Sequence, residues 1–263
     1  MTPHPAASAP SPWFPLPPEP AADPGTVLFC LPHAGAGASA YRRWPALLAD
    51  VAEVVPVQLP GRESRFGEPR CTRTAQVVDA LADHVLDRAA RHPRLAVFGH
   101  SMGALLAHEL AHALADRGRA PDHLFVSGYR APSLPRPSED VHRLPREELI
   151  AHLGRMEGTH PEVLAHPELL DLLLPVLRAD YELCETHRHT PRPPLSVPVT
   201  ALGGDADPGV APAHLAAWAE LTTGPFRHHL LPGGHFYLHD RLPDVLALLA
   251  DGLRALPAAR RAA

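Results

Sequence analysis

The fold of this chain is decided by the stretch Leu95-Ala96-Val97-Phe98-Gly99-His100-Ser101-Met102-Gly103-Ala104-Leu105-Leu106. A short apolar run typical of a buried strand leads into a Gly-X-Ser-X-Gly turn, and the turn leads into a helical pattern. Glycine has no Cβ, so strand and helix can approach closely and hold the Ser101 hydroxyl out at the carboxyl edge of a sheet. Ser101 is therefore a candidate nucleophile. The alternative is that Ser101 only caps the helix, since serine is favoured at helix N-termini.

The composition is that of an ordinary soluble globular protein. Its 263 residues, 45% hydrophobic and 20% charged, are enough for one large α/β domain. A formal net charge of -5 predicts neither nucleic acid nor a membrane surface as a partner. No apolar run reaches the roughly 18 residues of a membrane span. All basic residues are arginine, which excludes a Schiff-base lysine and the lysine of a phosphate-binding loop.

The cysteines and the chain ends indicate where the protein works and where its domain lies. Cys30, Cys71 and Cys184 are odd in number and match no metal-binding spacing, which favours free thiols in a reducing, cytoplasmic compartment. Residues 1–24 contain nine prolines and lack the basic start and apolar core of a signal peptide. We expect a disordered Pro/Ala-rich tail at 1–24, a single domain at 25–255 and a flexible C-terminal tail at 256–263.

Short apolar runs alternate with helical patterns along the domain, which is typical of βαβ units and a mostly parallel, doubly wound sheet. Strands are expected at 27–31, 54–59, 95–98, 124–127, 197–202 and 228–231. Helices are expected at 41–48, 74–91, 102–117, 212–221 and 243–253.

One connection between strands is far longer than the others. About seventy residues separate the strand ending near Ser127 from the one beginning at Val197, where a few residues are usual. Helical patterns at 146–155, 161–165 and 167–181 lie within it. We expect an insertion at about 132–192 that forms a helical lid over Ser101. The alternative is an extra helical layer with only a packing role.

A serine hydroxyl becomes a good nucleophile when a histidine takes its proton. His235 is the candidate, because Leu230-Leu231-Pro232-Gly233-Gly234-His235 places it just after the last strand, where two glycines free the backbone. His228 and His229 lie within that strand and are expected to be surface or packing residues. His239 lies four residues after His235, but no His-Glu-x-x-His motif accompanies the pair, so no metal site is expected.

The histidine in turn needs a carboxylate that orients it. In hydrolases with a serine on such a turn, that acid lies between serine and histidine in the chain. The strand at 197–202 runs into Gly203-Gly204-Asp205-Ala206-Asp207-Pro208. The spacing Gly-x-x-Asp before a turn favours Asp207, and Asp205 stays open as the second choice.

Acyl transfer also needs backbone N–H groups aimed at the developing oxyanion. Met102, directly after the serine, is one candidate donor, and the loop Pro32-His33-Ala34-Gly35-Ala36-Gly37 supplies the other. Ala34 is preferred there, with Gly35 close behind. The same loop partly imitates a Gly-x-Gly-x-x-Gly dinucleotide motif, but Ala40 stands in place of the third glycine, so a nicotinamide cofactor is not expected.

Several segments now occur in an order typical of one family. They are Pro32-His33-Ala34-Gly35, QLPGR at 58–62, Gly99-His100-Ser101-Met102-Gly103, SGYRAP at 127–132, LLPVLRAD at 173–180, GGDADP at 203–208 and GGHF at 233–236. From about Val27 to about Leu253, the chain resembles the type II thioesterases, which are stand-alone enzymes serving modular polyketide synthases and nonribosomal peptide synthetases. The serine turn is common to many hydrolases, whereas the segments at 58–62 and 173–180 are more particular to this family.

The resemblance implies an α/β-hydrolase fold with a helical lid, and the hydrolysis of acyl groups from the phosphopantetheine arm of acyl or peptidyl carrier proteins. Such enzymes remove aberrant or stalled units. Ser101, Asp207 and His235 would carry the reaction through an acyl-enzyme, with Ala34 and Met102 as oxyanion donors. We expect no cofactor, no metal and a monomeric chain. Two departures, Glu63 after Gly61-Arg62 and His160 in the lid, bear on the acyl chamber and not on the reaction.

Two other functions remain open at this point. A chain-releasing thioesterase or a small-molecule carboxylesterase would use the same residues on another substrate. A hydrolase-fold binding module with a dead site is the more remote alternative, because a silent scaffold does not need the nucleophile, the base and the acid in order.

Overall fold

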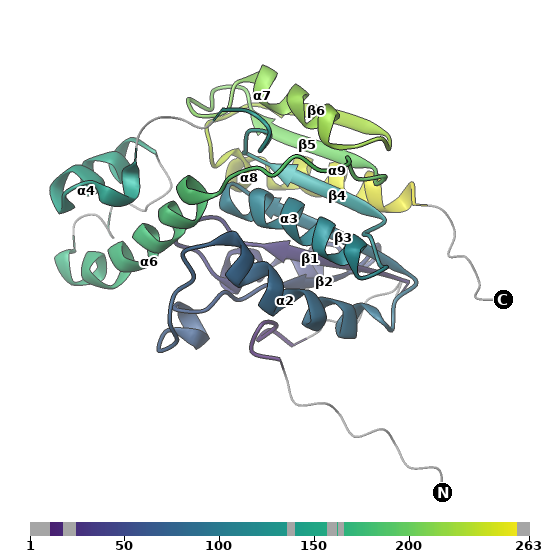
Figure 1. The fold of residues 1–263 in the computed structure, drawn as a ribbon, viewed down its shortest axis with the longest axis horizontal. Coiled ribbons are helices and arrows are strands. Elements are labelled where there is room, and N and C mark those ends of the chain that lie inside the picture. Colours follow the sequence, from purple (N-terminus) through teal and green to yellow (C-terminus); the bar gives the residue numbers. More distant parts are fainter. Residues whose placement is uncertain (1–10, 18–24, 136–139, 157–161, 163–165, 257–263) are drawn as a thin grey trace, which may run out of the picture.

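A six-stranded sheet with every neighbouring pair parallel forms the centre of the molecule (Figure 1). The computed structural model describes residues 11–17, 25–135, 140–156, 162 and 166–256. The strand order is β2-β1-β3-β4-β5-β6. The strands are β1 (Thr26–Leu31), β2 (Glu53–Pro56), β3 (Arg94–His100), β4 (His123–Ser127), β5 (Val199–Gly204) and β6 (Phe226–Leu231). The predicted α/β fold with a parallel sheet is confirmed.

Helices cover both faces of this sheet, which is why β1, β3 and β4 read as nearly continuous apolar runs. On one face lie α2 (Thr74–Ala89) and α3 (Met102–Asp116), together with α7 (Pro212–Ala216) and η4 (Ala217–Leu221), where Trp218 is fully buried. On the other face lie η1 (Ala38–Tyr41), α1 (Trp44–Leu47), α8 (Tyr237–Asp240) and α9 (Leu242–Arg254). The two apolar layers hold β3 at the middle of the sheet, where Ser101 follows it.

Some element boundaries differ from the sequence-based expectation. The strand expected at 54–59 ends at Pro56. Beyond it, the Gln58 N–H donates to the Trp13 carbonyl at 2.8 Å and not to a neighbouring strand. The helix expected at 41–48 is divided into η1 and α1. The helix expected at 161–165 lies outside the described residues, except for Glu162.

Residues 11–17 correct the expectation of a disordered tail over 1–24. Trp13 is only 4% exposed and packs in the core with α2. The guanidinium of Arg65 lies 4.3 Å from the centre of its ring. A buried tryptophan contributes a large apolar area, and this outweighs the poor propensity of the prolines around it. Leu256 is likewise buried, at the start of the expected C-terminal tail. The rest of both expected tails lies outside the described residues.

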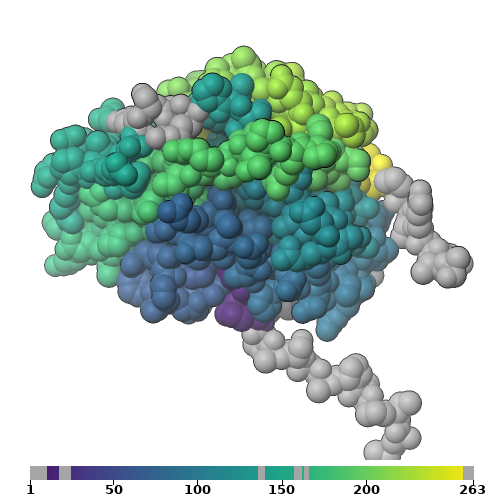
Figure 2. Space-filling view, in the orientation of Figure 1, coloured from purple at the N-terminus to yellow at the C-terminus, as the bar shows by residue number. Residues whose placement is uncertain are grey.

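The helical insertion forms one end of the molecule (Figure 2). It contains η3 (Val141–Arg143), α4 (Arg146–Arg155) and α6 (Pro167–Thr186). These elements share a small apolar core of their own, in which Leu149 of α4 packs with Leu170, Leu174 and Leu177 of α6. Within the part of the chain that the structure describes, no helix is long and apolar enough to cross a membrane.

Candidate active site

Ser101 stands on a strained turn between β3 and α3. Its backbone adopts φ 54° and ψ −122°, a conformation that residues with side chains rarely occupy. A Cβ on Gly99 would lie 1.9 Å from the carbonyl oxygen of Gly103, and a Cβ on Gly103 would lie 2.2 Å from the carbonyl oxygen of Leu31. The two glycines are therefore required by close backbone approach, and the turn presents the serine side chain beyond the carboxyl end of β3.

The structure brings Ser101, His235 and Asp207 into one chain of hydrogen bonds. His235 Nε2 lies 3.0 Å from Ser101 Oγ, and His235 Nδ1 lies 2.7 Å from Asp207 Oδ2. The Asp207 side chain is fully buried, and its other oxygen accepts the Gly209 N–H at 2.8 Å. A hydroxyl, an imidazole and a carboxylate in this order can activate the hydroxyl as a nucleophile.

Asp205, the second candidate acid, points elsewhere. It is exposed and accepts the Gly233 N–H at 3.0 Å. This bond holds the turn between β6 and His235, so Asp205 supports the loop without reaching the imidazole. The geometry therefore separates two carboxylates that the sequence left open.

Uncharged rings surround His235. Burial, together with the nearby His239 and His235, lowers the pKa of His33 to about 3. Burial and the same kind of neighbours hold the pKa of His100 well below its usual value. Both rings therefore stay neutral at physiological pH and add no positive charge beside His235. Behind them, the Tyr237 and Ser127 hydroxyls and His100 Nδ1 form a buried hydrogen-bonded row, with separations of 2.7 and 2.8 Å.

Ala34 and Met102 line the same cavity as Ser101. Met102 is the first residue of α3, so its N–H has no partner within that helix. The Gly35 N–H, the other candidate oxyanion donor, is engaged: it donates to Asp180 Oδ2 of α6 at 2.8 Å. The loop geometry therefore favours Ala34.

A buried ion pair fixes this loop to the insertion. Arg62 donates two hydrogen bonds to Asp180, at 2.6 and 2.8 Å, and both side chains are at most 5% exposed. Asp180 thus bonds to Arg62 and to the Gly35 N–H together. This arrangement ties α6 to the backbone beside the proposed oxyanion donor, a link between positions that are 145 residues apart.

The insertion encloses the space in front of Ser101. A cavity of about 390 Å³ lies there. Its walls include Met156 after α4, Leu177 and Tyr181 of α6, and Val210 after β5. These side chains are largely apolar, so the cavity suits an acyl chain next to a polar reacting centre.

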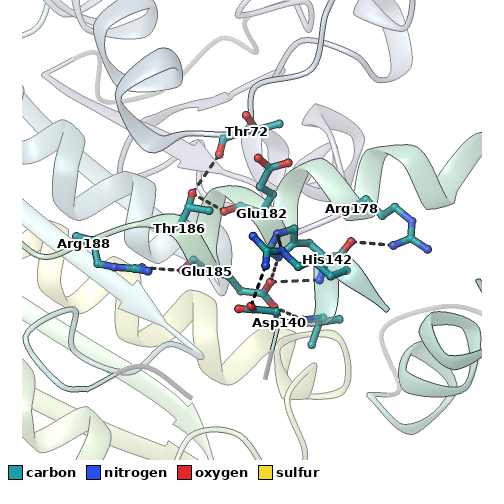
Figure 3. Close-up of polar contacts among 10 residues, drawn as sticks. Thr72, Asp140, His142, Arg178, Glu182, Glu185, Thr186 and Arg188 are labelled. Carbon is teal, nitrogen blue, oxygen red and sulfur yellow. Dashed lines mark hydrogen bonds and ion pairs between the residues drawn. The ribbon is translucent and has the colours of Figure 1, made fainter. Parts of the chain in front are cut away.

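Two arrangements could suggest a metal or a nucleotide. Asp140, His142 and Glu185 are close enough to share an ion, but Glu185 already accepts the Val141 N–H, the His142 N–H and the His142 ring (Figure 3). We assign these contacts to holding η3 on α6. Arg178 adds a bond to the His142 carbonyl, also drawn in Figure 3.

The glycine loop at 35–40 is not built as a pyrophosphate cradle. The carboxylate of Glu63 lies so close to Gly37 that a Cβ there would be 2.6 Å from it. This carboxylate accepts hydrogen bonds from both the N–H and the hydroxyl of Ser39. The Asp180 carboxylate holds the Gly35 N–H. Protein carboxylates thus occupy the donors that a phosphate would need, and the loop leads into a four-residue 3-10 helix instead of a long one.

Sequence reasoning missed the partners that hold the site together. Arg62 and Asp180 were noticed only as parts of family-like segments, and nothing local indicates that they meet. Ser127 was likewise noticed only as part of the SGYRAP segment, and Tyr237 carried no signal of its own. Arg130, which belongs to the SGYRAP segment, also lines the cavity in front of Ser101.

The family model and most of the similar proteins named here indicate the thioesterases. The family model of the thioesterase domain matches residues 26–252. The thioesterase PikA5 of Streptomyces venezuelae is 43% identical over 250 residues, covering 92% of this chain and 86% of PikA5. LgrE of Brevibacillus parabrevis, named linear gramicidin dehydrogenase, is 40% identical over 251 residues and 94% of each chain. The type II thioesterase BorB from the borrelidin biosynthetic cluster superposes with a TM-score of 0.82 at 41% identity, covering 90% of this chain and 96% of BorB.

Proposed function

This chain belongs to the thioesterase family, and from that premise we propose that it hydrolyses acyl groups from the phosphopantetheine arm of acyl or peptidyl carrier proteins. BorB and YbtT are named type II thioesterases, and the names of YbtT and ClbQ place them in nonribosomal peptide and polyketide pathways, which confirms the resemblance seen in the sequence. In such a pathway the reaction would remove aberrant or stalled units.

The observation that carries this proposal is the hydrogen-bonded row Ser101, His235 and Asp207 at the edge of an apolar cavity. His235 Nε2 takes the proton from Ser101 Oγ as that oxygen attacks the thioester carbonyl. The N–H groups of Ala34 and Met102 stabilise the tetrahedral oxyanion. The carbon–sulfur bond then breaks, and the departing thiolate takes the proton from His235, which leaves the imidazole neutral for the next step.

Hydrolysis of the acyl-enzyme completes the cycle. His235 takes a proton from a water molecule, whose oxygen attacks the ester carbonyl of acylated Ser101. The Ser101 oxygen leaves and regains a proton from His235, so the free acid is released and the enzyme is restored. Asp207 keeps the Nδ1 proton on His235 and stabilises the imidazolium that forms in both steps. No cofactor enters this sequence.

The insertion serves as the lid in this proposal. Its helices supply a wall of the cavity, and the Asp180 contacts with Arg62 and Gly35 join that wall to the oxyanion loop. The three unpaired cysteines support a cytoplasmic place of action, where thiols stay reduced. We also retain the prediction of a monomer.

Mass spectrometry of acetyl-, propionyl- and longer acyl-carrier proteins tests the proposal. The wild-type enzyme is expected to release the acyl group, and Ser101→Ala is expected to release none while keeping its unfolding midpoint. If simple esters are cleaved rapidly but carrier-bound acyl groups persist, the carboxylesterase alternative is correct. If neither substrate is cleaved, the chain is a binding module.

A further inference from the structure

A second cavity of about 490 Å³ adjoins the one in front of Ser101. The two cavities share Tyr129, Arg130 and Cys184 in their walls. The second cavity lies between the segment after β4, which includes Pro132 and Leu134, and the segment that follows α6. The two cavities are therefore neighbours, divided by these three shared side chains.

The charge of the second cavity is one-sided. Arg130, His187, Arg188 and His189 all contribute to its lining. None of the described residues that line it is an aspartate or a glutamate. Burial lowers the pKa of His187, so the positive charge of this lining comes from Arg130 and Arg188, and two guanidinium groups without a carboxylate in the same lining favour an anionic ligand.

Of the two arginines in this lining, Arg188 donates to the carbonyls of Glu185 and His187, whereas Arg130 has no such partner among the described residues. Its Nε is buried and has no hydrogen-bond partner, and no described carboxylate forms an ion pair with its guanidinium. Arg62, by contrast, is paired with Asp180, and Arg192, whose Nε is also without a partner, reaches Glu109 through Nη2. Arg130 is half-buried, and its guanidinium lies in the shared wall without a carboxylate partner in the described part of the chain, so it is available to an anionic group supplied from outside the chain.

We propose that the second cavity binds an anionic group of the thioester substrate and that Arg130 is its principal contact. The inference rests on the proposed function, because the substrate is the one bound at Ser101. A guanidinium presents paired N–H donors that match the two oxygens of a phosphate or a carboxylate. Two parts of a carrier-bound substrate offer such oxygens: the phosphate of the phosphopantetheine arm and a carboxylate on the acyl group.

Three chemically defined thioesters distinguish the phosphate from the acyl carboxylate as the bound anion. Butyryl-pantetheine has no anionic group, butyryl-4′-phosphopantetheine adds only the phosphate, and succinyl-pantetheine adds only an acyl carboxylate. The variant Arg130→Gln removes the charge and keeps hydrogen-bonding capacity, Arg130→Lys restores the charge, and Arg117→Gln, on the surface, is the matched control. Arg117 pairs with Asp83, which is 77% exposed.

Arg130→Gln is expected to lower kcat/KM by about 10- to 100-fold for the thioester whose anion occupies the cavity, mainly through KM. Its activity on butyryl-pantetheine should stay within about twofold of wild type, and Arg130→Lys should recover part of the loss. A loss confined to the phosphopantetheine thioester identifies the phosphate, and a loss confined to the succinyl thioester identifies the acyl carboxylate. An equal loss on all three, or no loss on any, overturns the proposal.

Binding to a variant that cannot react keeps this test separate from the proposed function. In the Ser101→Ala background, calorimetry is expected to show tighter binding of the anion-bearing compound than of its neutral counterpart, using 4′-phosphopantetheine against pantetheine and succinyl-pantetheine against butyryl-pantetheine. Adding Arg130→Gln should abolish that difference.

Unfolding in urea supplies a further control. A structural role for Arg130 would lower the free energy of unfolding in Arg130→Gln. Removal of a half-exposed charge that has no partner should leave the free energy of unfolding nearly unchanged. If the enzyme hydrolyses no carrier-bound thioester but the binding difference persists, the proposed function fails and the anion site stands.

Discussion

Replacing Asp207 by asparagine should nearly abolish catalysis while leaving the shape of the site intact. The Gly209 N–H donates to Asp207 Oδ1 at 2.8 Å, so the carbonyl oxygen of the new amide must take that position. The amide NH₂ then replaces Oδ2 and faces His235 Nδ1, which lies 2.7 Å away. An NH₂ group can only donate there, so it forces the proton of the imidazole onto Nε2.

That tautomer cannot accept the proton of Ser101, whose Oγ lies 3.0 Å from Nε2. The same change of tautomer in serine enzymes with this constellation lowers kcat by about 10⁴. At 1.36 kcal/mol for each factor of ten, this corresponds to about 5 kcal/mol of lost transition-state stabilisation. Because the exchange is isosteric and keeps the Gly209 bond, KM should change by less than about threefold.

Steady-state hydrolysis of an acyl-carrier protein, or of butyryl-phosphopantetheine, measures this effect. Asp205→Asn is the matched control, because its new carbonyl oxygen can still accept the Gly233 N–H, and activity should stay within about twofold of wild type. A loss in Asp207→Asn smaller than about a hundredfold would refute the tautomer argument. A larger loss in Asp205→Asn than in Asp207→Asn would refute the assignment of the acid itself.

Three further predictions follow from the packing and the charges. Asp180→Asn should lower the free energy of unfolding by about 3–5 kcal/mol and reduce kcat, because it leaves Arg62 buried without a counter-charge. The control is Asp171→Asn, since Asp171 lies on the same helix as Asp180 and forms an exposed ion pair with Arg146 of α4. This control should lower the free energy of unfolding by less than about 1 kcal/mol in urea titrations. Gly99→Ala should lower the free energy of unfolding by more than about 3 kcal/mol or fail to fold, because the new Cβ would lie 1.9 Å from the Gly103 carbonyl oxygen. The control Gly67→Ala should leave the melting temperature nearly unchanged, because no atom lies within 4 Å of the new Cβ. The free energy of unfolding should fall as the pH drops from about 6.5 towards 4, because burial lowers the pKa of His123 to about 4 and the unfolded chain takes up the proton first. The difference between the urea midpoints at pH 7 and pH 5 should be smaller in His123→Gln than in the wild type. An unchanged difference would contradict this origin.

Much of the architecture could be predicted from local sequence, because it depends on residues near one another in the chain. The apolar run at 95–98, the two flanking glycines and the following helical pattern specify strand, turn and helix without reference to the rest of the protein. His235 could be placed because two glycines after a strand pattern indicate where the chain turns at the sheet edge. The insertion was recognisable from its length and its own helical periodicity.

Tertiary structure decided the choices between neighbours. Asp205 and Asp207 are two residues apart and equally suited to a turn, and only the path of the chain from β5 to the His235 loop shows which carboxylate meets the imidazole. Ala34 and Gly35 were likewise open, until the bond from the Gly35 N–H to Asp180 showed that this donor is engaged. Trp13 is buried against the domain despite a proline-rich context, because its contacts lie with α2 and Arg65.

The sequence by itself determined the family, the parallel α/β fold and the side chains available to the reaction, since each of these is encoded in short segments with strict geometric needs. The folded chain alone decided which groups meet across long separations, such as Arg62 and Asp180, and that Arg130 faces two cavities. Such pairings depend on the order of the strands and the course of the insertion, which no local pattern contains. Arg130 stands in the sequence only as part of the SGYRAP segment, and it becomes a candidate ligand contact because the fold places it in the shared wall without an ion-pair partner among the described residues.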